Sequence, residues 1–135
     1  MPERLDEVHH IGIAVTNLED AKTIYCDILG LECIEEKTLP ERSVKVAFLE
    51  TGNTRIELIE GIGEESPVTK FIDRHGPGVH HLCFEVSDIS RVLAELAASG
   101  VRLIDETPRP GAEGKLVAFL HPKSTTGVLI ELSEK

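Results

Sequence analysis

Two histidines and two glutamates occupy matching places in the two halves of the 135-residue chain. His10 opens the run His-Ile-Gly-Ile-Ala-Val, and His81 opens the similar run His-Leu-Cys-Phe-Glu-Val 71 residues later. Glu57 lies within Ile-Glu-Leu, and Glu131 lies within the same three residues 74 positions further on. Two imidazoles and two carboxylates suit a first-row divalent metal ion and leave positions open for a substrate. The pattern therefore predicts a metal site held by His10, Glu57, His81 and Glu131.

These residues belong to a longer internal duplication. The block Val-Ala-Phe-Leu at residues 46–49 reappears at residues 117–120, again 71 positions later and in the same order relative to the other blocks. We place repeat one at about residues 8–60 and repeat two at about residues 79–133. A single histidine or glutamate in a strand is usually structural. Recurrence of both types at matched positions favours the ligand interpretation.

Strands must present these side chains, and the β-branched and apolar residues of 8–15 and 79–86 predict two of them. Alternate side chains of a strand point to opposite faces. His10 and His81 are therefore expected on the face away from the apolar residues that pack beneath a helix. The neighbouring histidines, His9 and His80, then point the other way, and we interpret them as structural.

Each first strand leads into a predicted helix. In repeat one the apolar residues from Leu18 to Leu29 recur at three- and four-residue steps, and residues 89–97 repeat the plan, with Asn17 and Asp88 as N-caps. The periodic apolar residues of the first helix are Leu18, Ala21, Ile24, Tyr25, Ile28 and Leu29. A connecting helix is expected at about residues 66–75. Each half then reads β-α-β-β-β.

The predicted fold class is α+β, a single domain over residues 1–135 in which two tandem β-α-β-β-β repeats form a curved mixed sheet around a metal-binding cleft. Glu60 has no evident counterpart in repeat two and is expected on the surface. The three cysteines, at positions 26, 33 and 83, lack metal-binding spacing and are expected to be reduced thiols.

Composition limits the partners. The formal net charge of −10 argues against nucleic acid as a partner, since neutralising phosphates needs a basic surface. No apolar run approaches the roughly 20 residues of a membrane-spanning helix. The N-terminal segment Met-Pro-Glu-Arg-Leu-Asp-Glu-Val has no apolar signal core, which favours a cytoplasmic protein.

The paired histidine motifs and the segment Gly127–Leu132 resemble the vicinal-oxygen-chelate superfamily, which has a glyoxalase-like fold. Its members include lactoylglutathione lyase, ring-cleaving dioxygenases and fosfomycin-resistance proteins. The stretch Arg102–Lys115 and the segment Phe-Leu-His-Pro-Lys-Ser at residues 119–124 are similar to the methylmalonyl-CoA epimerase family. This likeness extends from about His9 to Leu132.

The resemblance implies an isomerase that interconverts (2R)- and (2S)-methylmalonyl-CoA by removing and returning the C2 proton through a metal-stabilised enolate. It also implies one divalent ion per chain, Co²⁺ first and Ni²⁺, Mn²⁺ or Zn²⁺ as alternatives, an acyl-CoA substrate and a homodimer. The ligands of the family carry over onto the four residues named above. The alternative functions are a lactoylglutathione lyase and a non-catalytic metabolite-binding protein on the same scaffold.

Inversion at C2 is best served by two acid–base groups. Glu131 is our first choice for one of them, and Glu57, a bound water or another group could be the second. Some relatives carry a carboxylate at the position of Val46, and valine cannot move a proton. Lys115 and Lys123, in or near the Gly- and Pro-rich loop that could cover the cleft, are the basic residues expected to meet substrate anions.

Overall fold

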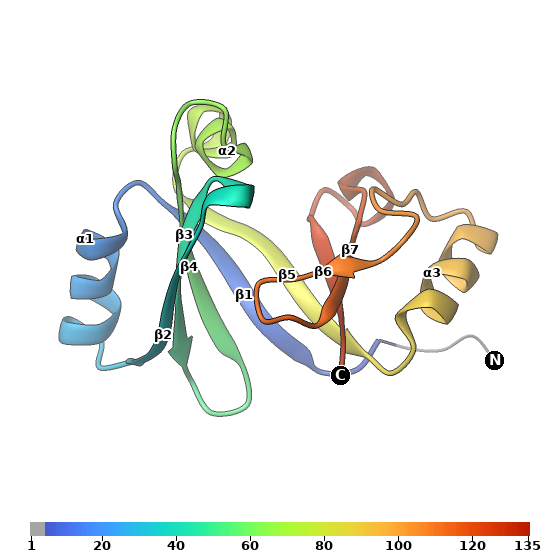
Figure 1. Cartoon of the computed structure of the whole chain (residues 1–135), viewed down its shortest axis with the longest axis horizontal. Helices are drawn as coiled ribbons and strands as arrows, with labels where there is room; N and C mark the ends of the chain where they lie inside the picture. Colours follow the sequence, from blue (N-terminus) through green and yellow to red (C-terminus); the bar gives the residue numbers. More distant parts are fainter. Residues whose placement is uncertain (1–4) are drawn as a thin grey trace. The chain divides into compact units, whose positions relative to one another are not determined.

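The computed structural model describes residues 5–135, so residues 1–4 of the N-terminal segment discussed above lie outside the described part (Figure 1). The chain divides into two compact units, which we describe separately. The first unit is His10–His80, and the second unit combines the N-terminal segment up to His9 with His81–Lys135. Within residues 5–135 no helix has both the length and the apolar character needed to cross a membrane.

The first unit is a four-stranded mixed sheet with one helical segment over a face and a second helix near the sheet's end (Figure 1). Its strand order is β2-β3-β4-β1, with β1 and β4 parallel and the other neighbours antiparallel. The elements are β1 (Val8–Val15), α1 (Leu18–Lys22), a π-helix (Thr23–Ile28), β2 (Glu32–Leu39), a 3₁₀-helix (Pro40–Arg42), β3 (Val44–Glu50), β4 (Arg55–Gly61) and α2 (Pro67–His75).

The second unit repeats this plan. Its strand order is β5-β8-β7-β6, with β5 and β8 parallel and the other neighbours antiparallel. The elements are β5 (Gly78–Val86), α3 (Ile89–Ala98), β6 (Arg109–Pro110), β7 (Leu116–Leu120), a 3₁₀-helix (Pro122–Ser124) and β8 (Ile130–Glu134). The predicted β-α-β-β-β pattern and the α+β class are therefore confirmed.

Each unit has its own apolar core between its helix and one face of its sheet. Alternation explains which residues enter it, because every second side chain of a strand points to the helix. In the first unit the buried members are Val15, Leu18, Ala21, Ala47, Leu49 and Leu58. In the second unit they are Val86, Ile89, Val92, Leu93, Ala118, Leu120, Ile130 and Leu132. The opposite face of each sheet carries a buried histidine and glutamate among further apolar side chains.

The predicted caps are confirmed. The side-chain oxygen of Asn17 accepts a hydrogen bond from the Asp20 N–H at 2.9 Å, and that of Asp88 accepts one from the Arg91 N–H at 3.2 Å. These bonds satisfy amides that the first turn of a helix leaves without a backbone partner.

The apolar stripe expected from Leu18 to Leu29 is wrong in its second half. Beyond α1 the chain continues as a π-helix, in which the N–H of Leu29 donates to the carbonyl of Ile24, five residues back, at 2.9 Å. The wider turn rotates the later residues away from the direction that a period of 3.6 predicts. Ile24, Ile28 and Leu29 are consequently exposed, Ile28 to 72%.

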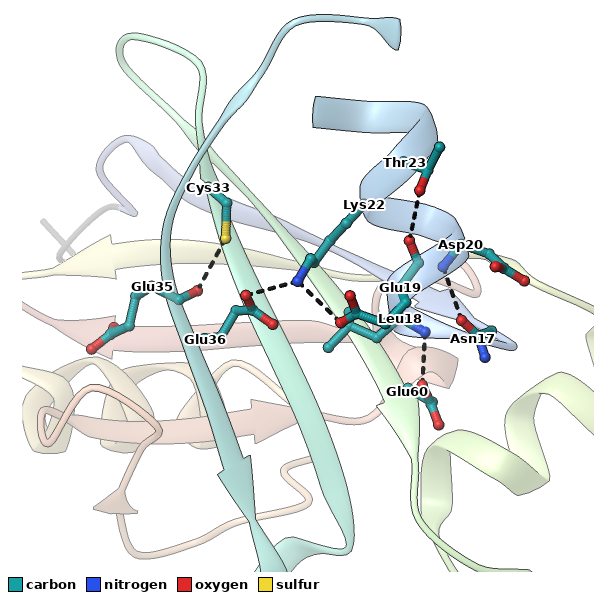
Figure 2. Close-up of polar contacts among 10 residues, drawn as sticks. All are labelled: Asn17, Leu18, Glu19, Asp20, Lys22, Thr23, Cys33, Glu35, Glu36 and Glu60. Carbon is teal, nitrogen blue, oxygen red and sulfur yellow. Dashed lines mark hydrogen bonds and ion pairs between the residues drawn. The ribbon is translucent and has the colours of Figure 1, made fainter. Parts of the chain in front are cut away.

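Glu60 was expected on the surface without a counterpart, and this expectation is also wrong. Its Oε1 accepts a hydrogen bond from the N–H of Leu18 at 2.7 Å (Figure 2). In the second unit Glu134 accepts one from the N–H of Ile89 at 3.0 Å. The two glutamates are 74 positions apart, like Glu57 and Glu131. Each last strand therefore holds the start of its unit's helix through a carboxylate.

A further ionic contact joins α1 to β2. The Lys22 ammonium lies 2.8 Å from a carboxylate oxygen of Glu36 and 3.0 Å from one of Glu19 (Figure 2). The hydrogen bond to Glu36, followed by that to Glu19, raises the pKa of Lys22 above its ordinary value. The Lys22 ammonium is therefore charged at neutral pH.

The carboxylate anchor predicts a measurable loss of stability. Because a hydrogen bond to a charged group contributes about 1.5–3 kcal/mol, Glu60→Ala should lower the free energy of unfolding by about that amount in urea titrations. Glu64→Ala, at an exposed position near the end of the same strand, is the matched control and should change it by less than about 0.5 kcal/mol. Equal effects of the two substitutions would contradict the anchoring role.

Candidate metal centre

The first unit brings two of the predicted ligands together. β1 and β4 run parallel with Gly12 opposite Glu57, so His10, two residues before Gly12, lies on the same face as the glutamate. His10 Nε2 is 3.3 Å from Glu57 Oε1. Both residues are buried, at 6% and 7% exposure.

The second unit contains the same arrangement. β5 and β8 run parallel with Cys83 opposite Glu131, and His81 again lies two residues earlier on the same face. His81 Nε2 is 3.1 Å from Glu131 Oε1, and the residues are 4% and 7% exposed. In both units a small residue lies directly opposite the glutamate, Gly12 in the first and Cys83 in the second. The imidazole that meets the carboxylate lies diagonally across the two strands.

A phenylalanine flanks each pair. Phe48 lies opposite Glu57, and its ring meets the ring of His10 edge-on at 6.2 Å and 82°. Phe119 lies opposite Glu131 and meets His81 at 5.9 Å and 75°. Such edge contacts restrict the orientation of the imidazoles. Sequence reasoning missed this role, although the repeated Val-Ala-Phe-Leu block carried the signal.

The donor chemistry of these pairs fits a divalent cation. A carboxylate removed from water is costly unless a positive charge or a set of hydrogen bonds compensates it. Imidazole nitrogen and carboxylate oxygen are ligands that first-row metals accept, and each unit holds one of each within 3.3 Å. The residues of each pair can therefore contribute two ligands to such an ion.

The neighbouring histidines make other contacts. His9 Nε2 lies 3.4 Å from a carboxylate oxygen of Glu113, in the Gly- and Pro-rich loop. The ring of His80 meets the ring of Phe71, in α2, at 4.8 Å and 74°. His9 belongs to the second unit and His80 to the first, because the unit boundaries fall within β1 and β5, so each contact lies within one unit. The structural interpretation of the two histidines stays a prediction.

The two lysines proposed to meet substrate anions are exposed. The carbonyl of Lys115 accepts a hydrogen bond from Gly111 at 2.7 Å, and the N–H of Lys123 donates to His121 Nδ1 at 3.1 Å. Their ammonium groups form no ion pair with any residue from 5 to 135. A role in substrate binding stays a prediction for both.

Val46 is fully buried and shares a face with Phe48 and Glu57, since Val46 lies opposite Ile59 two residues from the Phe48–Glu57 pairing. The position where some relatives have a carboxylate thus faces the ligand side of the sheet. On the edge strand β2, Lys37 lies opposite Val46. On the same face Glu35 lies opposite Phe48, and its carboxylate is 3.6 Å from the Lys37 ammonium.

The sequence and the fold are similar to those of known proteins. Residues 9–119 match the family described as the Glyoxalase/Bleomycin resistance protein/Dioxygenase superfamily. The mitochondrial methylmalonyl-CoA epimerase of Dictyostelium discoideum is 41% identical, over 97% of this chain and 80% of its own length.

Two solved structures agree with the relationship. The methylmalonyl-CoA epimerase of Mycobacterium tuberculosis superimposes with a TM-score of 0.91 at 35% identity, covering 99% of this chain and 91% of that one. A variant of the Streptomyces coelicolor methylmalonyl-CoA epimerase in complex with 2-nitronate-propionyl-CoA gives 0.92 at 33% identity, covering 98% and 96%. The chain therefore belongs to the Glyoxalase/Bleomycin resistance protein/Dioxygenase superfamily and is a homologue of the methylmalonyl-CoA epimerases within it.

Proposed function

We propose that the protein is a metal-dependent epimerase that interconverts (2R)- and (2S)-methylmalonyl-CoA. The observation that carries the proposal is the duplicated pair of buried imidazole and carboxylate, in the same strand register in both units. Homology to epimerases over nearly the whole chain supports the substrate. The same relatives favour an epimerase over lactoylglutathione lyase.

His10, Glu57, His81 and Glu131 are the proposed ligands of one shared divalent ion. We propose Co²⁺ as this ion, with Ni²⁺, Mn²⁺ and Zn²⁺ as alternatives that the ligand set also accepts. A cytoplasmic location and a homodimer are part of the same proposal. When bound, the ion supplies Lewis-acid stabilisation of the negative charge that develops on the thioester oxygen.

The protein's own residues move the proton. Glu131 takes the C2 proton of one epimer, and the electron pair of the broken C–H bond enters the enolate. Return of a proton to the opposite face re-forms the C–H bond with inverted configuration. Glu57, from the other repeat, is the proposed second acid–base group, since Val46 has no proton to give. The edge contacts of Phe48 and Phe119 keep the two imidazoles in fixed orientations.

Solvent exchange tests the activity directly. The Co²⁺-loaded protein incubated with methylmalonyl-CoA in D₂O should incorporate deuterium at C2 while the two epimers equilibrate, as followed by mass spectrometry and chiral analysis. Treatment with a chelator should abolish both, and Co²⁺ should restore them. Turnover of the glutathione hemithioacetal without exchange at C2 would refute the epimerase.

Metal binding can be measured without any substrate. Calorimetric titration with Co²⁺ should give one site per chain, and His10→Ala and His81→Ala should each weaken it by more than about 100-fold, since even an outer-shell partner changes affinity by about 10- to 100-fold. At a Co²⁺ concentration of about 100 times Kd, the wild-type protein should gain about 2.7 kcal/mol of stability. The control His75→Gln changes an exposed histidine at the end of α2 and should leave binding unaltered. Two independent sites per chain would contradict the shared ion.

Substitution of the two glutamates separates proton transfer from ligation. Glu131→Gln retains an oxygen donor and removes the base, so exchange should fall by about 10²- to 10⁴-fold while Co²⁺ still binds. With Glu57→Gln, exchange from one epimer should persist while inversion is lost, because only one face keeps its acid. Full inversion by Glu131→Gln would exclude that residue as a base.

A further inference from the structure

Arg109, on the short edge strand β6, shares an aromatic neighbour with the proposed ligand His81 of the second unit. It pairs with Val117, two residues from Phe119 along β7. The guanidinium carbon lies 5.8 Å from the centre of the Phe119 ring, which is a cation–π distance. The same ring contacts the His81 imidazole at 5.9 Å. One aromatic side chain thus contacts both the guanidinium and the proposed ligand.

Asp105 fixes the orientation of this arginine. Its Oδ1 lies 3.4 Å from Arg109 Nε, and its Oδ2 accepts a hydrogen bond from the N–H of Phe119 at 2.8 Å. The carboxylate is mostly buried, whereas the arginine side chain is about half exposed. The Nη groups engage no other side chain of residues 5–135 in an ion pair. The guanidinium is therefore braced at Nε, and about half of the arginine side chain remains exposed to solvent.

Repeat one carries a cation at the equivalent place. Lys37 lies opposite Val46 as Arg109 lies opposite Val117, and it is 3.6 Å from Glu35. The second copy has a planar guanidinium, which lies at a cation–π distance from Phe119 and is braced on Nε by Asp105. A planar guanidinium can donate two parallel hydrogen bonds to the two oxygens of a carboxylate. A lysine ammonium attracts a carboxylate only as a point charge.

We propose that Arg109 binds the free carboxylate of the substrate's malonyl group and selects carboxyacyl thioesters over simple acyl thioesters. The inference rests on the proposed function. Arg109 and the proposed ligand His81 contact the same ring, Phe119, so Arg109 belongs to the part of the site that holds the thioester. The pantetheine arm separates the phosphates of coenzyme A from the thioester, whereas the malonyl carboxylate is next to it. The carboxylate is therefore the better partner for Arg109. Beside the proposed divalent ion, the guanidinium adds a second positive charge for an anion on a chain of net charge −10.

The test compares three ligands on Co²⁺-loaded protein by calorimetry. Methylmalonyl-CoA has both the carboxylate and the phosphates, propionyl-CoA lacks the carboxylate, and methylmalonyl-pantetheine lacks the phosphates. Arg109→Gln should raise the Kd of both methylmalonyl thioesters about 10- to 100-fold, the value of a charged hydrogen bond. The Kd of propionyl-CoA should stay within about twofold. Arg109→Lys should recover only part of the loss, because it cannot bind bidentately.

A control substitution and three contrary results complete the test of Arg109. Arg91→Gln removes an exposed cation of α3 that pairs with Glu95, and it should leave all three affinities unchanged. Weaker binding of both CoA thioesters with methylmalonyl-pantetheine spared would assign Arg109 to a phosphate and overturn the inference. So would equal weakening of all three ligands together with a lower Tm, or no change at all. Wild-type protein without C2 exchange would overturn the epimerase proposal and this inference together.

Discussion

The parallel pairing of the first and last strands within each repeat is the constraint on which the site depends. A parallel ladder fixes which residues lie opposite each other, and in both units it sets a small residue against the glutamate with the histidine two positions earlier. A slip by one residue would turn the carboxylate into the apolar core. The helix of each unit prevents that slip, because its apolar residues need the opposite face of the same strands.

Much of this arrangement could be predicted from the sequence, because the internal duplication identifies candidate ligands that a single repeat would not reveal. His10 and Glu57 alone would be unremarkable residues of two strands, but their recurrence at matched positions singled them out. The strands, the caps and the β-α-β-β-β order followed from periodicity and short polar signals. These features are local, and neighbouring residues determine them.

The rest depends on backbone geometry and on register across strands. The π-helix at residues 23–28 changes which residues face the core, and a count at 3.6 residues per turn cannot detect it. Glu60 was missed although the offset of 74 that pairs Glu57 with Glu131 also pairs it with Glu134, because its role is a hydrogen bond to a backbone amide 42 residues away that the sequence pattern does not show. The sequence analysis did not single out Arg109, because a two-residue edge strand gives no periodic signal.

The last strand of each repeat carries two glutamates three positions apart, and an odd spacing sends them to opposite faces. Glu57 meets the imidazole of His10, while Glu60 grips the first amide of α1. On β8, Glu131 likewise meets the imidazole of His81, and Glu134 accepts a hydrogen bond from the first amide of α3. One strand therefore connects the start of the helix to the proposed ligand, so fraying at the helix start would shift that carboxylate without any change in the ligand residues themselves.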